Sequence, residues 1–193
     1  MNPEYISKWR PLFWQGVLLK VEVGITLRKL LTCGLGINRQ FVDERIRTVF
    51  LNGHPLDDIK SAFVDDGAHV ALGGALPGIV GIAMQRQSPV RFIRHNINFR
   101  SEDVPIKLKI GEVTMKLFNE IAVALDRVIL RRGIIVEVGT LLGYLNEPEG
   151  ILRVELSGKV STLTVVKQQL SEYEYTSSKS VLLEVVSSDT HDR

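Results

Sequence analysis

The stretch from residue 49 to residue 74 constrains the fold more than any other part of the sequence, because two turn signals separate its apolar runs. The run Val49–Leu51 precedes Asn52-Gly53, the strongest short signal for a β-hairpin, since both residues tolerate the positive φ of a type I′ turn. A second turn is expected at Asp65-Asp66-Gly67, and a strand over His69–Leu72 leaves it. The stretch therefore predicts a compact antiparallel sheet.

This stretch and the segment before it resemble the β-grasp sulfur carriers, namely the small subunit of molybdopterin synthase and its thiamin-pathway relative. Upstream, the apolar run of residues 17–24 and the sequence Thr26-Leu27-Arg28-Lys29-Leu30-Leu31 are similar to a strand and the Thr-Leu-x-x-Leu-Leu helix opening of that fold. Downstream, the Asn-Gly and Asp-Gly turns, the Val-Ala-Leu strand and Gly73-Gly74 resemble its second half. The resemblance covers residues 12–74 and implies a β-grasp-like, ubiquitin-like N-terminal unit.

The chain departs from these carriers at the glycine pair. The resemblance implies a C-terminal Gly-Gly whose carboxylate is adenylated and converted to a thiocarboxylate, but here Ala75 and the rest of the chain follow Gly74. Carrier chemistry would therefore require cleavage after Gly74. The other interpretation is a Gly-rich turn between a strand and the next segment.

The whole chain predicts an α+β fold with two units. Apolar spacing predicts helices over Ile25–Leu35 and Asn119–Arg132, the second with Asn119 as N-cap and Gly133 as terminator. Residues 38–48 are expected to cross the surface without regular structure. Short or alternating apolar runs predict strands at 12–23 (two strands around Gln15-Gly16), 90–100, 106–118 (a hairpin turning at Gly111-Glu112), 134–138, 152–166 (a hairpin) and 181–186.

Charge and composition fit a soluble protein with two units. Hydrophobic side chains make up 45% of the 193 residues and the net charge is +2, which gives no strong attraction to nucleic acid or membrane. Residues 1–100 carry 13 basic and 8 acidic side chains, while residues 101–193 carry 11 and 14. With a connector at Gln85–Pro89, this asymmetry predicts a β-grasp-like domain of residues 1–88 and a second α+β domain of residues 89–193.

The densest basic cluster lies on the predicted strand of residues 90–100. Arg91 and Arg94, with His95 on that segment and His54 from the hairpin, are the candidate ligand-binding residues. Arginine recognises phosphate or carboxylate bidentately. The alternative is that these charges are solvated and keep an edge strand from pairing with another chain. Single-stranded nucleic acid is not expected to bind here, because no aromatic side chains on which bases could stack accompany the arginines.

A Gly-rich segment follows the predicted β-grasp-like sheet. It lacks the Lys-Ser/Thr of a P-loop and a complete G-x-G-x-x-G pattern. Exposed, such a segment is a candidate interface or ligand loop. The candidate interface residues are Gly73, Gly74, Pro77, Gly78, Ile79, Val80 and Gly81.

No catalytic constellation or metal-ligand spacing is present in the sequence, so neither a cofactor nor a metal is expected. Cys33, the single cysteine, is expected to be a buried small side chain and favours a reducing compartment. Asp57-Asp58 and Asp65-Asp66 are expected to be turn formers. With no signal-peptide pattern and no apolar run of membrane-spanning length, the expected location is the cytoplasm.

Two hypotheses for function remain. The first is a non-catalytic interaction module that contacts a protein partner or self-associates. The second is a ligand-binding protein or enzyme with its site between the two halves, and a processed sulfur carrier is a third possibility.

Overall fold

The computed structural model describes residues 6–94, 96–99, 107–144, 152–156, 159–161 and 180–185, and the fold is α+β as the sequence predicts. Two compact units make up the chain, one formed by Phe13–Ala124 and the other by Met1–Leu12 together with Leu125–Arg193. The separate folding of residues 1–88 and 89–193 stays a prediction.

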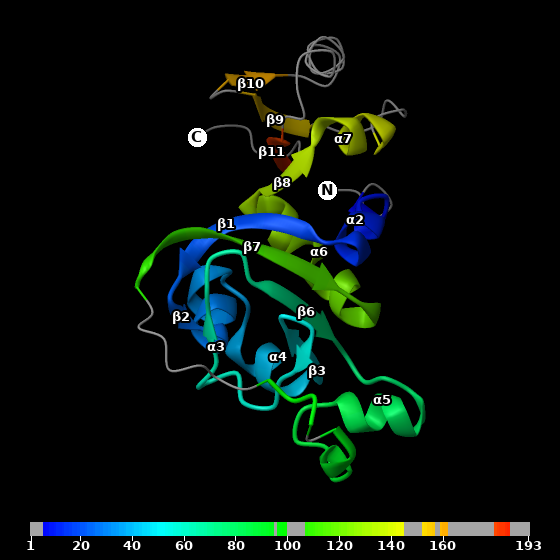
Figure 1. Cartoon of the computed structure of the whole chain (residues 1–193). Helices are drawn as coiled ribbons and strands as arrows, with labels where there is room; N and C mark the ends of the chain where they lie inside the picture. The colour runs from blue at the N-terminus through cyan, green and yellow to red at the C-terminus, as the bar shows by residue number, and fades with distance from the viewer. Residues whose placement is uncertain are drawn as a thin grey trace. The chain divides into compact units, whose positions relative to one another are not determined.

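A mixed sheet forms the centre of the Phe13–Ala124 unit (Figure 1). Its strands are β1 (Val17–Val23), β3 (Thr48–Leu51), β4 (His54–Pro55), β6 (His69–Gly73) and β7 (Lys109–Leu117). They lie in the order β1-β7-β6-β3-β4, with β6 parallel to β7 and every other pair antiparallel. A smaller pair joins β2 (Ile25–Thr26) to β5 (Phe63–Val64).

The predicted hairpin after β3 is confirmed. Asn52 and Gly53 have φ values of 51° and 82°, as a type I′ turn requires, and Leu51 pairs with His54 across the turn. Gly67, in the second predicted turn, has a φ of 79°. Local turn chemistry therefore sets the chain direction at both places.

Helices cover one face of this sheet (Figure 1). Helix α3 (Leu27–Lys29) continues into the π-helical turn η1 (Leu30–Gly34), and Leu27, Leu30 and Leu31 are fully buried. Helix α4 (Arg39–Glu44) occupies residues that are expected from sequence to lack regular structure. It begins there because the Asn38 side chain accepts hydrogen bonds from the backbone N–H groups of Gln40 and Phe41.

Two strand predictions near the ends of this sheet are wrong. Where two strands around Gln15-Gly16 are expected, residues 12–15 belong to helix α2 (Arg10–Gln15) and only β1 is a strand. The predicted hairpin at 106–118 is also a single strand, because β7 runs straight through Gly111-Glu112 and pairs with β1 along its length.

The predicted strand at residues 90–100 is wrong as well. Helix α5 (Gly78–Met84) and the 3-10 helix η2 (Arg91–Arg94) precede a set of turns that reaches Asn98. The alternation of arginine with apolar residues misleads because Arg94 points inward, toward acceptors supplied by other segments.

The other unit contains four strands that pair antiparallel with one another. Strand β11 (Ser180–Val185) lies between β8 (Ile134–Glu137) and β9 (Leu152–Leu156), and β9 pairs with β10 (Lys159–Ser161). The β9-β10 pair and β11 confirm the predicted last hairpin and last strand over their described residues. The predicted helix is confirmed as α6 (Asn119–Arg132), which enters this unit at Leu125 and ends before Gly133 at φ 90°. Asn119 is its first residue and not its N-cap, because the backbone N–H groups of Ile121 and Ala122 donate to the Phe118 carbonyl. Helix α7 (Val138–Tyr144) follows β8.

Candidate functional site

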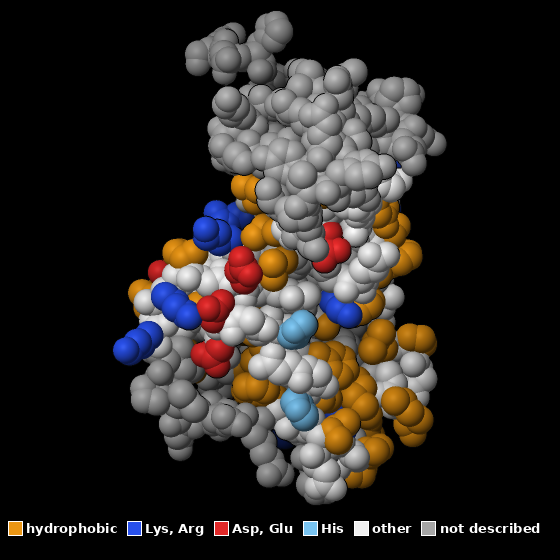
Figure 2. All heavy atoms as spheres, turned by 45° about the horizontal axis from the view of Figure 1, so that its top comes forward, with side chains coloured by type: hydrophobic (Ala, Val, Ile, Leu, Met, Phe, Trp, Pro, Cys, Tyr) orange, Lys and Arg blue, Asp and Glu red, His pale blue; other side chains and the backbone are white. Residues whose placement is uncertain are grey.

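An exposed apolar surface lies on α5 and η2. These two helices contact each other. Ile79 and Val80 of α5 are 69% and 67% exposed, and Phe92 and Ile93 of η2 are 69% and 60% exposed. We call these four residues together with Ile82 the α5–η2 surface; Figure 2 shows hydrophobic side chains gathered at the lower right, over α5.

The local sequence explains how α5 forms and why it presents this surface. Gly78 begins the helix with a φ of 78°, after Pro77 in extended conformation. Gly81 is needed because a Cβ atom there would lie 2.8 Å from the Leu76 carbonyl carbon and oxygen. Only Ala83 of α5 is buried. The helix is therefore attached along a narrow edge, and its isoleucine and valine side chains face outward.

Arg94 fastens η2 to the end of α5. Its side chain is 1% exposed, and its Nε donates to the Ala83 carbonyl at 2.5 Å. Its Nη2 donates to Asp57 Oδ1 at 2.7 Å and to the Gln85 carbonyl at 3.1 Å, and its Nη1 donates to Asn98 Oδ1. The buried charge is thus matched by one carboxylate and several neutral acceptors, as a buried cation requires.

The predicted ligand cluster is only partly brought together. Arg91 is exposed, while the Arg94 guanidinium is committed to protein acceptors. The exposed His54 has its Nδ1 3.0 Å from the Ile97 carbonyl oxygen, and His95 lies outside the described residues. A ligand-binding role for this cluster stays a prediction.

The glycine pair of the carrier resemblance is packed inside the unit. Gly73 ends β6, and Gly74 is buried with its carbonyl accepting a hydrogen bond from Thr48 Oγ1 at 2.9 Å. A Cβ atom on Gly74 would lie 1.7 Å from Glu120 Oε1. Neither glycine therefore resembles a free, flexible tail in the intact chain.

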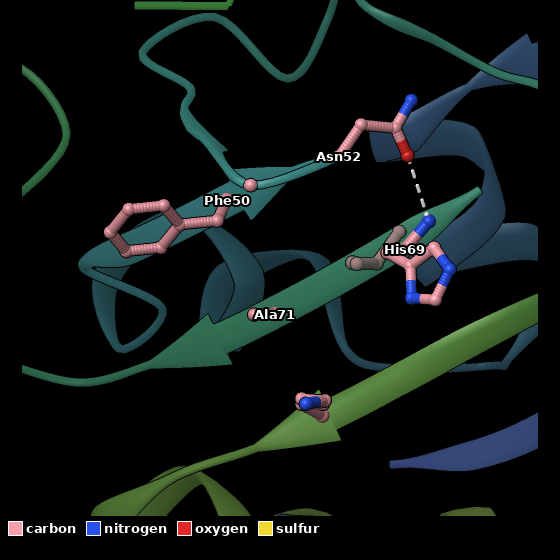
Figure 3. A pocket seen from close by; sticks show the side chains of 7 residues that line it. Phe50, Asn52, His69 and Ala71 are labelled. Carbon is pink, nitrogen blue, oxygen red and sulfur yellow. Dashed lines mark hydrogen bonds between the residues drawn. The ribbon is translucent and has the colours of Figure 1, made fainter. Parts of the chain in front are cut away.

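A shallow hollow opens on the sheet where β3, β6 and β7 lie side by side (Figure 3). Its volume is about 560 Å³, and Phe50, Ala71, His69 and Lys116 contribute to its lining. The Asn52 side chain accepts a hydrogen bond from the His69 backbone N–H at 2.9 Å, which fixes one rim. The hollow could hold a small apolar group, but its lining brings no nucleophile and base together.

Cys33 differs from its expected position. The thiol is free and exposed, so the prediction of a buried side chain is wrong. Within the described part of the chain, no group of three or more His, Cys, Asp or Glu side chains is arranged to hold a metal ion. No helix among those residues is long and apolar enough to cross a membrane.

Sequence reasoning identifies Ile79 and Val80 but misses the η2 half of the α5–η2 surface. Phe92 and Ile93 are adjacent apolar residues, yet nothing local tells whether such a pair is buried or exposed. Comparison with known proteins finds no family model, no curated protein and no solved structure that matches this chain.

Proposed function

We propose that the chain is a non-catalytic interaction module that self-associates through the α5–η2 surface. The observation that carries the proposal is the clustering of large, strongly exposed apolar side chains on two helices in contact. Contiguous exposed apolar patches are uncommon on monomeric soluble proteins and mark interaction sites.

A second copy of the chain is the partner that this surface fits best. Helix α5 has no charged residue, so the α5 faces of two copies can approach each other without like-charge repulsion. In a two-fold dimer the same patch contributes from both sides, and isoleucine and phenylalanine side chains would then leave water together. Arg91, exposed beside Phe92, would lie at the rim of that interface.

The β-grasp-like character of the Phe13–Ala124 unit is part of the same proposal. It is supported by the order strand, helix, hairpin and strand from β1 to β6 around one sheet. Strand β7, from beyond the resembling residues, lies between β1 and β6. A processed sulfur carrier has less support, because cleavage after Gly74 would separate β7 from the strands on both its sides.

A cytoplasmic location is the other part of the proposal. The exposed, free thiol of Cys33 supports it, since a reducing compartment keeps such a thiol from oxidising.

The test replaces the apolar side chains by lysine. Ile79→Lys and Val80→Lys each place charges opposite their own copies and remove apolar contact, so the dissociation constant of the dimer should rise about tenfold or more. Sedimentation velocity over a concentration series measures the change. The matched control is Ile110→Lys, on a β7 isoleucine that is 63% exposed and lies outside the α5–η2 surface.

The proposal expects an oligomer for the unaltered chain and for Ile110→Lys, with dissociation confined to the α5 variants. A monomeric unaltered chain at every accessible concentration would contradict self-association. If all three substitutions raised the dissociation constant of the dimer equally, the contact between copies would lie outside the α5–η2 surface.

A further inference from the structure

A second feature of the Phe13–Ala124 unit is a strongly basic pocket whose lining includes none of the residues that define the α5–η2 surface. Its volume is about 480 Å³. Five cationic side chains and one carboxylate contribute to its lining: Arg28, Arg39, Arg47, Lys60, Arg86 and Asp43. We call it the basic pocket.

The fold gathers these cations from five separate segments. Arg28 comes from α3 and Arg39 from α4, Arg47 immediately precedes β3, Lys60 lies in the turn before β5, and Arg86 follows α5. The Arg86 backbone N–H donates to the Arg47 carbonyl at 2.6 Å, which holds two of the arginines side by side. No run of basic residues in the sequence marks this site.

Two of the arginines are fixed by contacts within the protein. Arg28 Nη2 donates to Asp43 Oδ2 at 2.5 Å. Arg86 Nη1 donates to the carbonyls of Ile46 at 3.0 Å and Val42 at 3.2 Å. Burial lowers the pKa of Arg86, and the nearby positive charge of Arg28 lowers it further, while neighbouring carboxylates oppose this. The floor of the pocket is thus a preorganised cation held by neutral backbone acceptors.

The other three cations are available. Among the residues that the structure describes, the side chains of Arg39, Arg47 and Lys60 take part in no hydrogen bond or ion pair, and all three are exposed. Asp57 is already paired with Arg94, and Asp58 accepts from the Lys60 backbone N–H. The pocket therefore keeps an excess of positive charge after its internal pairs are formed.

We propose that the basic pocket binds a small molecule that carries two or more phosphate groups. Several guanidinium groups that converge from different sides match the oxygens of such an anion, which one arginine alone would hold only weakly. The volume lies in the range of small-ligand sites. Apart from Ile46, the lining is polar or charged, so the charged groups would supply the affinity.

Nucleic acid fits this pocket less well than a small anion. The lining contains no aromatic side chain on which a base could stack. The cations also surround a hollow rather than following an extended groove, as a nucleic-acid backbone would require.

The experiment is isothermal titration of the full-length chain with sodium tripolyphosphate at about 0.15 M salt, where long-range charge effects are screened. We expect one tripolyphosphate per chain. Arg39→Glu and Arg47→Glu should each weaken binding about tenfold or more, because each removes a cation and adds a repulsive carboxylate. Arg45→Glu is the control, because it makes the same charge change in an exposed residue two positions before Arg47 and outside the pocket lining.

A second variant changes affinity in the opposite direction. Asp43→Asn removes the carboxylate of the pocket and releases Arg28, so tripolyphosphate should bind several-fold more tightly, which a partly unfolded variant could not mimic. The proposal would be overturned if tripolyphosphate did not bind to the unaltered chain. It would also be overturned if Arg45→Glu weakened tripolyphosphate binding as much as Arg39→Glu and Arg47→Glu do. Tighter binding of a single-stranded oligonucleotide than of tripolyphosphate would replace it with a nucleic-acid site.

Discussion

Asp66 links the second turn of the unit to strand β7. Its Oδ2 accepts from Lys109 Nζ at 2.8 Å, and its Oδ1 accepts from the Glu112 backbone N–H at 2.8 Å. Both bonds favour the ionised carboxylate, so the pKa of Asp66 lies below its ordinary value of 3.8, first through Lys109 and then through Glu112. One side chain thus couples the turn to the strand through its charge.

This coupling predicts a dependence of stability on pH. Because the pKa of Asp66 is lowered by folding, its contribution is present above the unfolded value of 3.8 and is lost as pH falls through the lower folded value. Asp66→Asn should be less stable than the unaltered chain at about pH 6, and the difference should shrink on acidification. Urea denaturation at several pH values measures it. Asp65→Asn, at the neighbouring exposed carboxylate, is the control, and a difference that does not change with pH would contradict the assignment.

Two turn predictions, at Asn52-Gly53 and at Gly111, show where the role of a single residue can and cannot be predicted from sequence. Asn52-Gly53 is predicted correctly because the preference for positive φ is a property of those two residues. Gly111 is wrongly predicted to be a turn residue because its role is spatial. A Cβ there would lie 2.7 Å from Asp66 Oδ1 and 2.8 Å from Val23 Cγ2, and both neighbours are remote in sequence.

At the scale of elements, η2 depends on one buried ion pair. Arg94 is almost fully buried, while its partner Asp57 is 28% exposed. Replacing Arg94 removes the donor for two backbone carbonyls and one carboxylate at once. Loss of one member of a buried, hydrogen-bonded pair is among the more costly single changes in a protein.

Arg94→Leu should therefore lower the free energy of unfolding by about 3 kcal/mol. Arg91→Leu removes the same charge from an exposed position on the same helix, and it should change the free energy by less than about 0.5 kcal/mol. Chemical denaturation of both variants gives the comparison. Similar losses in the two variants would mean that the ion pair does not hold η2.

Elements with local signals are predicted well, and elements held by distant partners are not. Helix α6 has its apolar stripe, basic last turn and terminating glycine within its own sequence. Residues 90–100 have an alternating pattern that suits a strand, but Arg94 finds its acceptors at Asp57, Ala83 and Gln85. The pattern alone does not reveal which arginine turns inward.

For the whole molecule, the compact unit Phe13–Ala124 predicts how fragments behave. A fragment of residues 13–124 keeps all five strands of the β1-β7-β6-β3-β4 sheet and should unfold cooperatively on heating. A fragment of residues 1–88 lacks β7 and leaves the inner edges of β1 and β6 unpaired, so it should give no cooperative transition. Circular dichroism on heating separates the two outcomes, and a cooperative transition of residues 1–88 would instead support the predicted domain boundary.

The α5–η2 surface and the basic pocket also differ in how much of each can be predicted from the sequence. The Gly-rich segment is enough to single out Ile79 and Val80, because glycines flank these exposed apolar residues along the chain. The excess of basic residues in the first half is visible as well, yet it does not indicate which arginines meet. That information depends on the fold that brings α3, α4 and the residue after α5 together.

The position of β7 also affects how the protein reaches its native state. Val17, at the start of β1, pairs with Met115, and Val70 pairs with the same residue from the other side. Contacts between residues so distant in sequence have a large entropic cost of loop closure, and they therefore make folding slower. On the ribosome, β1 and β6 would emerge early and would each keep an unpaired edge until the residues of β7, up to Leu117, have been synthesised and can pair with them.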